Sequence, residues 1–559
     1  MRKPFLKSAF AATTVALIAA SCGTTSPVIT STPIENIDQQ PLKNIALTDV
    51  ELKGWGGADL VQDTIPGMSV QKAYDEIIKD YQGKTVIVGV IDSGIDIEHE
   101  DLKNVIWVNE DEIPGNGIDD DKNGYIDDIH GWNFLGDAIA ENLEYVRIIK
   151  RLQPKYEGKT KNDVAASDLA EFEMYQAAQQ EFEKEYNETT QNQNYYQQLL
   201  ASVNNSSKLV SEKLGKEDFS REELMAMEAD TPELQQAQAF LNNIMMNIGD
   251  LEEAKEQLQE GIDYFNTRLE SHFNLEFDGR AIVGDDPYDI TDVNYGNNDV
   301  DGPDEKKEDA KHGTHVAGII AAERNNNIGM NGVAKNVKIM ALRAVPDGDE
   351  YDKDIALAIR YAVDNGAKVI NTSFGKYFSP NPEWVTDAIK YAAKHDVLIV
   401  NAAGNDATDL DTKMVYPNDQ KPGESLEISD NFLTVGASSY AYGDKLVASF
   451  SNYGKQNVDV FAPGTKIWAT TPLDQYEYLQ GTSMAAPAVA GVAALIRSYY
   501  PKLTAAQVKQ VIMQSGLSSS ADVIVGGNPE DVRPFSELSV SGKMVNLYNA
   551  FILADKMSK

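Results

Sequence analysis

The chain has 559 residues, 42% of them hydrophobic, which is enough to build a large buried core. Its formal net charge of −38 argues against binding to nucleic acid or to anionic membranes, because both require basic patches. We therefore expect an acidic protein with no nucleic-acid partner and a general affinity for cations.

The first 22 residues have the pattern of an export signal. A basic start is followed by the apolar stretch 9–20, which is too short to span a membrane comfortably. Small residues then precede Cys22, the single cysteine, as in bacterial lipoprotein signals, although Ala19 stands where leucine is usual. We predict a signal peptide over 1–21 and a tether over 22–52, lipid-anchored through Cys22 to a membrane of the Gram-negative cell envelope. Ordinary signal cleavage with a free Cys22 is the alternative.

The next two features are a strand and an acidic loop. Residues 85–91 form an unbroken apolar run, which predicts a buried strand ending at Asp92. An EF-hand-like spacing follows, with glycine at its sixth position but His130, not glutamate, at its twelfth. We predict a calcium site there, and a plain turn of acidic and amide residues is the alternative. Its expected ligands are Asp119, Asp121, Asn123 and Asp127.

A long segment over 141–275 has helical periodicity. Apolar residues alternate at steps of three and four from Leu234 to Leu269, with Lys255 as the polar exception. A weaker pattern of the same kind runs from Phe172 to Val203. We predict an antiparallel helical hairpin that either packs only on itself or binds a protein partner.

Two further strings complete a set of reactive groups. His312 precedes the apolar run 316–322, and Ser483 precedes the run of small residues 485–496. A hydroxyl is a poor nucleophile that needs an adjacent base, and the base needs a third group to hold its tautomer. Asp92, His312 and Ser483 supply a carboxylate, an imidazole and a hydroxyl for these roles.

These strings resemble the signature blocks of the subtilases, the subtilisin-like serine proteases. They are Asp92-Ser93-Gly94, His312-Gly313-Thr314-His315 and Gly481-Thr482-Ser483-Met484-Ala485-Ala486-Pro487. Their order of Asp, His and Ser differs from that of chymotrypsin and of the α/β-hydrolases. The resemblance covers about residues 80–140 and 276–516. It implies an α/β three-layer sandwich with a mostly parallel central sheet, and a catalytic domain over 53–140 and 276–559 that the hairpin interrupts.

The resemblance also implies roles for individual residues. Ser483 attacks the peptide carbonyl, His312 moves the proton and Asp92 orients the imidazole. The side-chain amide of Asn405, with the backbone N–H of Ser483, stabilises the oxyanion. Substrate-binding positions follow from the same match, with Val415 at the base of the pocket. They are Ser373, Phe374 and Gly375 on one wall and Ala402, Ala403 and Gly404 on the other.

A second calcium site is implied by the resemblance. Asp101 matches a carboxylate that joins a loop after the catalytic histidine. In that loop Asn326 is expected to give a side-chain oxygen, and Arg324, Ile328 and Met330 are expected to give backbone carbonyls. The acid-rich segment 285–304 is a third and weaker candidate.

We therefore expect a subtilisin-like serine endopeptidase with structural Ca²⁺ that acts on peptide or protein substrates. The alternative class is an envelope scaffold whose hairpin binds a partner. Fluorophosphonate labelling of Ser483 separates the two, because the scaffold does not require a reactive serine.

Overall fold

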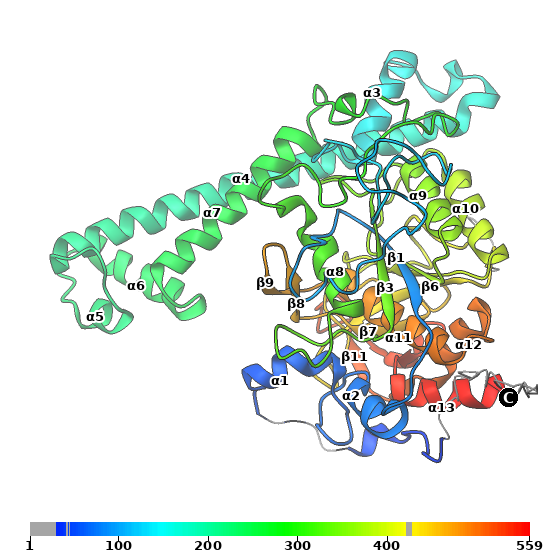
Figure 1. Ribbon diagram of the computed structural model, residues 1–559. Helices are drawn as coiled ribbons and strands as arrows, with labels where there is room; N and C mark the ends of the chain where they lie inside the picture. The colour runs from blue at the N-terminus through cyan, green and yellow to red at the C-terminus, as the bar shows by residue number, and fades with distance from the viewer. Residues whose placement is uncertain (1–28, 41–42, 44, 421–426) are drawn as a thin grey trace, which may run out of the picture.

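The computed structural model describes residues 29–40, 43, 45–420 and 427–559 (Figure 1). The predicted signal peptide and Cys22 lie outside these ranges, so they stay predictions. No helix in the described ranges has the length and apolar character needed to cross a membrane.

A central sheet carries the fold. In the described part of the chain nine strands lie in the order β10-β13-β7-β6-β5-β4-β1-β3-β2. All neighbouring pairs are parallel except β10 with β13. The strands are β1 (Val86–Asp92), β2 (Gly131–Asn133), β3 (Val337–Arg343), β4 (Val369–Thr372), β5 (Leu398–Ala402), β6 (Phe432–Ser438), β7 (Val460–Pro463), β10 (Leu517–Ser518) and β13 (Lys543–Met544). Two separate pairs are β8 (Ile467–Thr471) with β9 (Gln475–Leu479) and β11 (Asp522–Ile524) with β12 (Val532–Pro534).

Helices cover both faces of this sheet, because successive side chains of a strand point to opposite sides. Val88 and Val90 of β1 belong to one core, and Ile91 belongs to the other. The first core contains α8 (Lys311–Ala321), α11 (Thr482–Tyr499), α12 (Ala505–Ser515) and α13 (Leu547–Ser558). The second contains α9 (Asp352–Asp364) and α10 (Pro382–Lys394). The expected three-layer α/β sandwich is confirmed.

The segment before β1 differs from the predicted tether. Ile37 is only 1% exposed, and the backbone of Ile34 exchanges hydrogen bonds of 2.7 and 3.0 Å with the Asn549 side chain of α13. Further on, Trp55 is also 1% exposed and donates to the carbonyl of Thr465 at 3.0 Å. Residues 29–40 therefore lie packed on the body, because this polar stretch contains isolated apolar residues that find buried sites. The short helices here are α1 (Asp49–Gly54) and α2 (Val70–Ala73).

The insertion forms a long helical projection (Figure 1). Its helices are α3 (Glu144–Tyr156), α4 (Leu169–Leu214), α5 (Arg221–Ala226), α6 (Pro232–Asn247) and α7 (Leu251–Thr267). We call residues 169–267 the arm. With 46 residues, α4 is about 70 Å long at about 1.5 Å per residue. α6 and α7 return along it, so the predicted antiparallel arrangement is present.

The regular pattern from Leu234 to Leu269 predicts a single helix for the returning half of the arm. The structure has two helices there instead, α6 and α7. The break lies at Gly249, which has φ +126°, and Asp250 then caps α7 by accepting from the Glu253 N–H at 2.8 Å. The apolar period continues across the break because both helices pack on the same face of α4. Their shared core includes Val203, Val210, Leu241, Ile244, Leu251 and Leu258.

The base of the arm has a core of its own, built around a helix that the periodicity does not predict. Ile149 and Tyr156 of α3 pack with Phe172 of α4 and with Phe273, which follows the arm. Phe378, which follows β4 of the body, packs against the same core, so α3 belongs with the body as much as with the arm.

Candidate active site

Asp92 is the last residue of β1 and lies at the carboxyl edge of the sheet. It is 2% exposed, and its Oδ1 accepts from the Ser93 N–H at 2.8 Å and from Nδ1 of His312 at 2.6 Å. The second oxygen, Oδ2, is buried without a hydrogen-bond partner in the described residues. A buried carboxylate bonded to an imidazole holds that ring in one orientation.

His312 lies in the first turn of α8, whose start packs closely on the turn after β1. A Cβ on Gly313 would lie 2.1 Å from the carbonyl oxygen of Gly94, so only glycine allows this approach. Gly94 itself has φ +123°. The two glycines of the sequence blocks therefore bring the imidazole to Asp92.

The electrostatic environment tunes the imidazole as a base. Burial alone would lower the pKa of His312, but the charge of Asp92 and the hydrogen bond to it outweigh burial and raise the pKa. Since Nδ1 is bonded to Asp92, the other nitrogen, Nε2, is the one left to accept a proton. The side chain is 39% exposed, so that nitrogen can be reached from solvent.

Ser483 is the second residue of α11 and is partly exposed. Its hydroxyl donates to the carbonyl of Ser373 at 3.1 Å, and among the described residues it makes no hydrogen bond with His312. In return the Ser373 hydroxyl donates to the Ser483 carbonyl at 2.9 Å. Catalytic hydrogen bonds are often formed only when substrate binds, and rotation about one side-chain bond redirects this hydroxyl.

Thr482, to which the sequence analysis assigns no role, orients the Asn405 side chain so that its amide nitrogen can donate a hydrogen bond. The Oδ1 atom of Asn405 accepts from the N–H and the hydroxyl of Thr482 at 2.9 and 3.0 Å, so Nδ2 is directed away from them. A Cβ built on Gly481 would lie 3.4 Å from that Nδ2 and 3.6 Å from the Ser483 nitrogen. The Ser483 N–H belongs to the first helical turn, where backbone donors lack helical partners. Both predicted oxyanion donors therefore flank Gly481.

The predicted substrate-binding positions continue two neighbouring strands. β4 pairs with β5 in parallel, with Thr372 opposite Asn401, so 373–375 and 402–404 leave the same sheet edge side by side. A Cβ on Gly375 would lie 3.0 Å from Val415, so Val415 lies against this region, and its place at the base of a pocket stays a prediction. Ser373, Ala402 and Ala403 are buried, Phe374 and Gly404 are half-buried and Gly375 is exposed.

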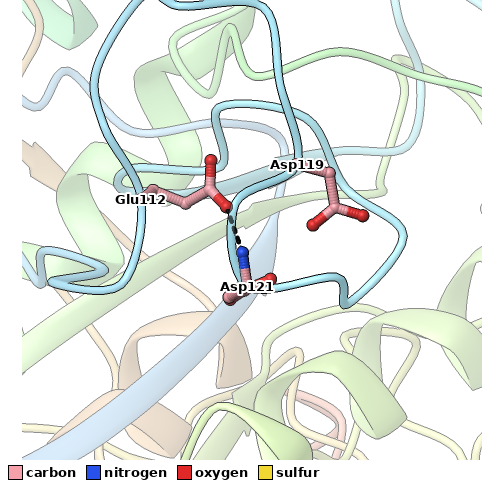
Figure 2. Close-up of side chains that lie close together, drawn as sticks. All are labelled: Glu112, Asp119 and Asp121. Carbon is pink, nitrogen blue, oxygen red and sulfur yellow. Dashed lines mark hydrogen bonds between the residues drawn. The ribbon is translucent and has the colours of Figure 1, made fainter.

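The acidic loop gathers a different set of ligands from the predicted one (Figure 2). Carboxylate oxygens of Glu112, Asp119 and Asp121 lie within 4.8 Å of one another. Glu112 is 6% exposed, its Oε1 accepts from the Asp121 N–H at 3.1 Å, and its Oε2 is buried without a partner in the described residues. Three carboxylates with one unsatisfied buried oxygen fit a hard cation such as Ca²⁺.

Two of the predicted ligands of this loop have other partners. Asp127 accepts from the N–H groups of Asn116 and Gly117 at 3.2 and 2.8 Å, which directs it to a separate turn. The amide nitrogen of Asn123 donates to Asp121 at 3.0 Å. Glu112 was missed because it precedes the loop by seven positions, outside the EF-hand spacing.

At the second predicted calcium site, the loop after the catalytic histidine contacts Asp101 directly. Both oxygens of Asp101 accept hydrogen bonds, at 2.6 Å from the Asn326 side-chain amide and at 3.2 Å from the Met330 N–H. The guanidinium of Arg324 lies 3.9 Å over the ring of Tyr74, whereas its predicted ligand atom is the backbone carbonyl oxygen. Asn326 and Met330 therefore lie beside Asp101, and calcium binding by Asp101, Asn326, Arg324, Ile328 and Met330 stays a prediction.

In the third candidate, segment 285–304, the carboxylate of Asp285 is paired with cations of the protein itself. Asp285 pairs with Arg280 at 2.7 Å and with Lys353 at 2.6 Å. These two charges occupy the carboxylate, so it does not fit a metal.

Comparison with known proteins agrees with this geometry. A model of the subtilase family matches residues 83–528. The chain is 39% identical over 242 residues to the thermophilic serine proteinase of Bacillus sp. strain AK1, covering 43% of this chain and 51% of that protein. It is 37% identical over 239 residues to the cell wall-associated protease of Bacillus subtilis strain 168, covering 43% of this chain and 25% of that protein.

A shorter relative is covered more completely. Subtilisin DY of Bacillus licheniformis is 38% identical over 203 residues, which cover 35% of this chain and 67% of that protein. The chain spans about half the length of the first relative and a quarter of the length of the second. On the family match and on the arrangement of Asp92, His312 and Ser483, this chain belongs to the subtilase family.

Proposed function

We propose that the protein is a serine endopeptidase that hydrolyses peptide bonds in peptide or protein substrates. The observation that carries this proposal is the 2.6 Å hydrogen bond between Asp92 and His312 at the sheet edge where Ser483 and Asn405 also lie. Each group needed for acyl transfer is present there, and the reaction needs no metal.

In the proposed reaction the Ser483 hydroxyl turns from the Ser373 carbonyl toward His312. Its oxygen attacks the peptide carbonyl carbon while Nε2 of His312 takes the proton, and Asp92 stabilises the imidazolium that forms. The Asn405 amide and the Ser483 N–H stabilise the negative oxygen. His312 then gives its proton to the leaving amine as the C–N bond breaks. Water hydrolyses the resulting ester with His312 again as the base.

The test combines labelling with turnover. A fluorophosphonate should label the wild-type protein at Ser483, and Ser483→Ala should lose both the label and the hydrolysis of a peptide library. Folded wild-type protein that neither labels nor cleaves would refute the endopeptidase. It would favour the scaffold class, in which the arm binds a partner without proteolysis.

We propose further that Glu112, Asp119 and Asp121 hold a structural Ca²⁺. A cation bound only by the native state stabilises it, by about 2.7 kcal/mol at a free concentration of 100 times Kd. Ca²⁺ should therefore raise the Tm of the wild-type protein, and Glu112→Gln should remove most of that rise. Glu110→Gln, which changes an exposed carboxylate of the same segment, is the matched control. Equal rises in wild type and Glu112→Gln would refute the site.

We propose that the protein is exported and anchored by lipid at Cys22 in the Gram-negative cell envelope. The basic start, the short apolar stretch and the small residues before Cys22 support this. A radioactive fatty acid should label the wild-type protein and not Cys22→Ser. Because no other cysteine is available, a label that survives this change would refute lipid attachment there.

We also propose that the arm binds a protein, either a substrate or a partner. The support is its extension away from the body and the exposure of large apolar side chains on it (Figure 1). Leu209, Met225 and Met246 are 41%, 55% and 57% exposed. Replacement of residues 194–265, the outer part of the arm, with a short Gly/Ser loop tests this proposal.

A further inference from the structure

The chain enters and leaves the insertion through one place on the catalytic body. Asp347 donates its N–H to the Ile139 carbonyl at 2.8 Å and accepts from the Glu141 N–H at 2.9 Å. On the return, His272 lies 3.1 Å from the Asp347 carboxylate and accepts the Leu143 N–H at its carbonyl at 3.2 Å. Both ends of the insertion are therefore attached beside the segment that precedes α9.

Lys376, which follows the predicted substrate-binding segment 373–375, is bonded to the start of the insertion and to the segment that precedes α9. Lys376 is 4% exposed, and its Nζ lies 2.7 Å from Glu144 Oε2, 2.9 Å from Asp352 Oδ1 and 2.6 Å from the Glu350 carbonyl. An ammonium group has three protons, so all its donors are used. A buried charge of this kind requires such partners.

The first turns of α3 supply the other side of this network. The Glu144 N–H donates to Asp349 at 2.7 Å, and Arg147 donates to the carbonyls of Asp349 and Glu350 at 2.6 and 3.0 Å. Arg147 also contacts Glu144 and lies 3.9 Å over the Tyr351 ring. α3 therefore holds 349–351 with its backbone and arginine, and holds Lys376 with its carboxylate.

The carboxylate of Glu144 is charged under ordinary conditions. Burial alone would raise its pKa, but the charges of Arg147 and Lys376 outweigh burial and lower the pKa to about 2. The link from α3 to Lys376 is therefore a charged hydrogen bond, which is about twice as strong as a neutral one.

Lys376 fixes the far end of the segment that the substrate is expected to contact. Its N–H and carbonyl pair with Tyr416 at 2.9 and 2.8 Å, while the near end of the segment contacts Ser483 through Ser373. At about 3.3 Å per residue, Gly375 lies roughly 7 Å beyond Ser373 along an extended chain. A bound peptide reaches it only with two or three residues on the amino side of the cleaved bond.

We propose that Glu144 is a positioning residue for peptide binding: through Lys376 it holds segment 373–375 in the conformation that pairs with an extended substrate. The first helix of the insertion then acts as part of the wall of the peptide site. This inference rests on the proposed endopeptidase.

The experiment compares Glu144→Gln with the wild-type protein on a series of chromogenic peptides. The series carries one, two, three and four residues before the cleaved bond. KM should be unchanged for the shortest peptide and about tenfold higher for the longest, because only longer peptides use the far end of the segment. The kcat and the rate of fluorophosphonate labelling should stay within about twofold, since Ser483 and His312 are not displaced.

Lys155→Met is the matched control on the same helix. Lys155 pairs with Glu171 at 2.5 Å, but both side chains are at least 40% exposed, so KM should not change for any peptide. If Glu144→Gln does not fold, Glu144→Asp keeps the charge and shortens its reach, and it should show the same length dependence at smaller size.

Three outcomes overturn the inference. KM values of the folded Glu144 variant that match wild type for every peptide would show that the network only stabilises the fold. An equal rise for short and long peptides would remove the far end of the segment as the cause. A fall in labelling rate would show that Glu144 acts on the nucleophile instead. Wild-type protein that does not label at all would refute the endopeptidase itself, which is a separate failure.

Discussion

The contribution of Asn405 to turnover can be predicted from how its side chain is held. The Oδ1 atom accepts two hydrogen bonds from Thr482, of 2.9 and 3.0 Å, and both Nδ2 and the Ser483 nitrogen lie close to Gly481. Asn405→Ala removes one of two oxyanion donors. Loss of such a donor costs about 2.7–4 kcal/mol, which is about 10²–10³ in kcat; subtilisin is the worked case behind this figure.

Asn405→Asp separates donation from packing. The carboxylate keeps an acceptor for Thr482 but replaces the donor with a negative charge near the developing oxyanion. Two unit charges about 4 Å apart interact with about 4 kcal/mol at an effective dielectric constant of about 20, so kcat should fall about a further thousandfold. Thr482→Val removes one of the two bonds that orient the amide and should cost less than about tenfold.

The assay is steady-state hydrolysis of one peptide, with Tm measured for every variant to confirm folding. Fluorophosphonate labelling of Ser483 should persist in Asn405→Ala, because the nucleophile and base are intact. A kcat for Asn405→Ala equal to that of wild type would remove Asn405 from the oxyanion site. Equal kcat values for the Ala and Asp variants would show that no negative charge develops near this position.

Three further predictions concern the triad, pH and the arm. Ser483→Ala and His312→Ala should each abolish hydrolysis, and the double variant should be hardly worse than either; multiplying losses would contradict a shared mechanism. Asp92 raises the pKa of His312 above 6.5, and His312 acts as a base only when it is neutral. The value of kcat/KM should therefore increase with pH, with a midpoint above pH 6.5, and Asp92→Asn should lower that midpoint. Replacing 194–265 with a short Gly/Ser loop should leave small-peptide cleavage within about tenfold, or 1.4 kcal/mol, and change protein cleavage much more. Equal effects on both substrates would reduce the arm to structural support.

The raised pKa of His312 also affects stability. A group whose pKa is higher in the folded state stabilises that state fully below its unfolded pKa, about 6.5 for histidine. The contribution of the His312–Asp92 pair should therefore be complete below about pH 6.5 and disappear as pH rises through the folded pKa. A thermal midpoint measured against pH in wild type and Asp92→Asn would show this as a difference confined to lower pH.

The boundaries of the arm replacement follow from the structure rather than from the periodicity. Gln193 donates to Asn266 at 2.7 Å, so the two ends of the removed segment lie next to each other. Cutting there keeps α3 and the base core around Phe172 and Phe273. A deletion that starts at 145 would instead remove Arg147 and leave Glu144 without one of its two cations.

Local sequence was sufficient for the strand that ends at Asp92 and for the reactive groups. The apolar run 85–91 places Val88 and Val90 in one core and Ile91 in the other, and a short continuous run of this kind is typical of a strand buried on both faces. The blocks around Asp92, His312 and Ser483 carry their own glycines, which set the close approaches that the chemistry needs. Asn405 was found in the same way, because its neighbours Ala402, Ala403 and Gly404 belong to a recognisable string.

Features that depend on distant partners could not be predicted. Periodicity predicts that the apolar residues from Leu234 to Leu269 share one face. It does not reveal the break at Gly249, because α6 and α7 both pack on α4 and the apolar spacing continues across the break. Glu112 joins Asp119 and Asp121 only because the chain turns back on itself, and Asn326 presents its amide to Asp101 only in the folded loop.

The amino-acid sequence by itself therefore determined the α/β class, the order of the reactive groups and the existence of a helical insertion. The α/β class follows from the resemblance of the short strings to the subtilases, and the insertion follows from hydrophobic period; strings and period are both local properties. The tertiary structure alone decided which charges are buried together, most clearly where Lys376 meets Glu144 across 232 positions of chain. Burial makes such pairs strong and selective, and burial is a property of the whole fold rather than of any segment.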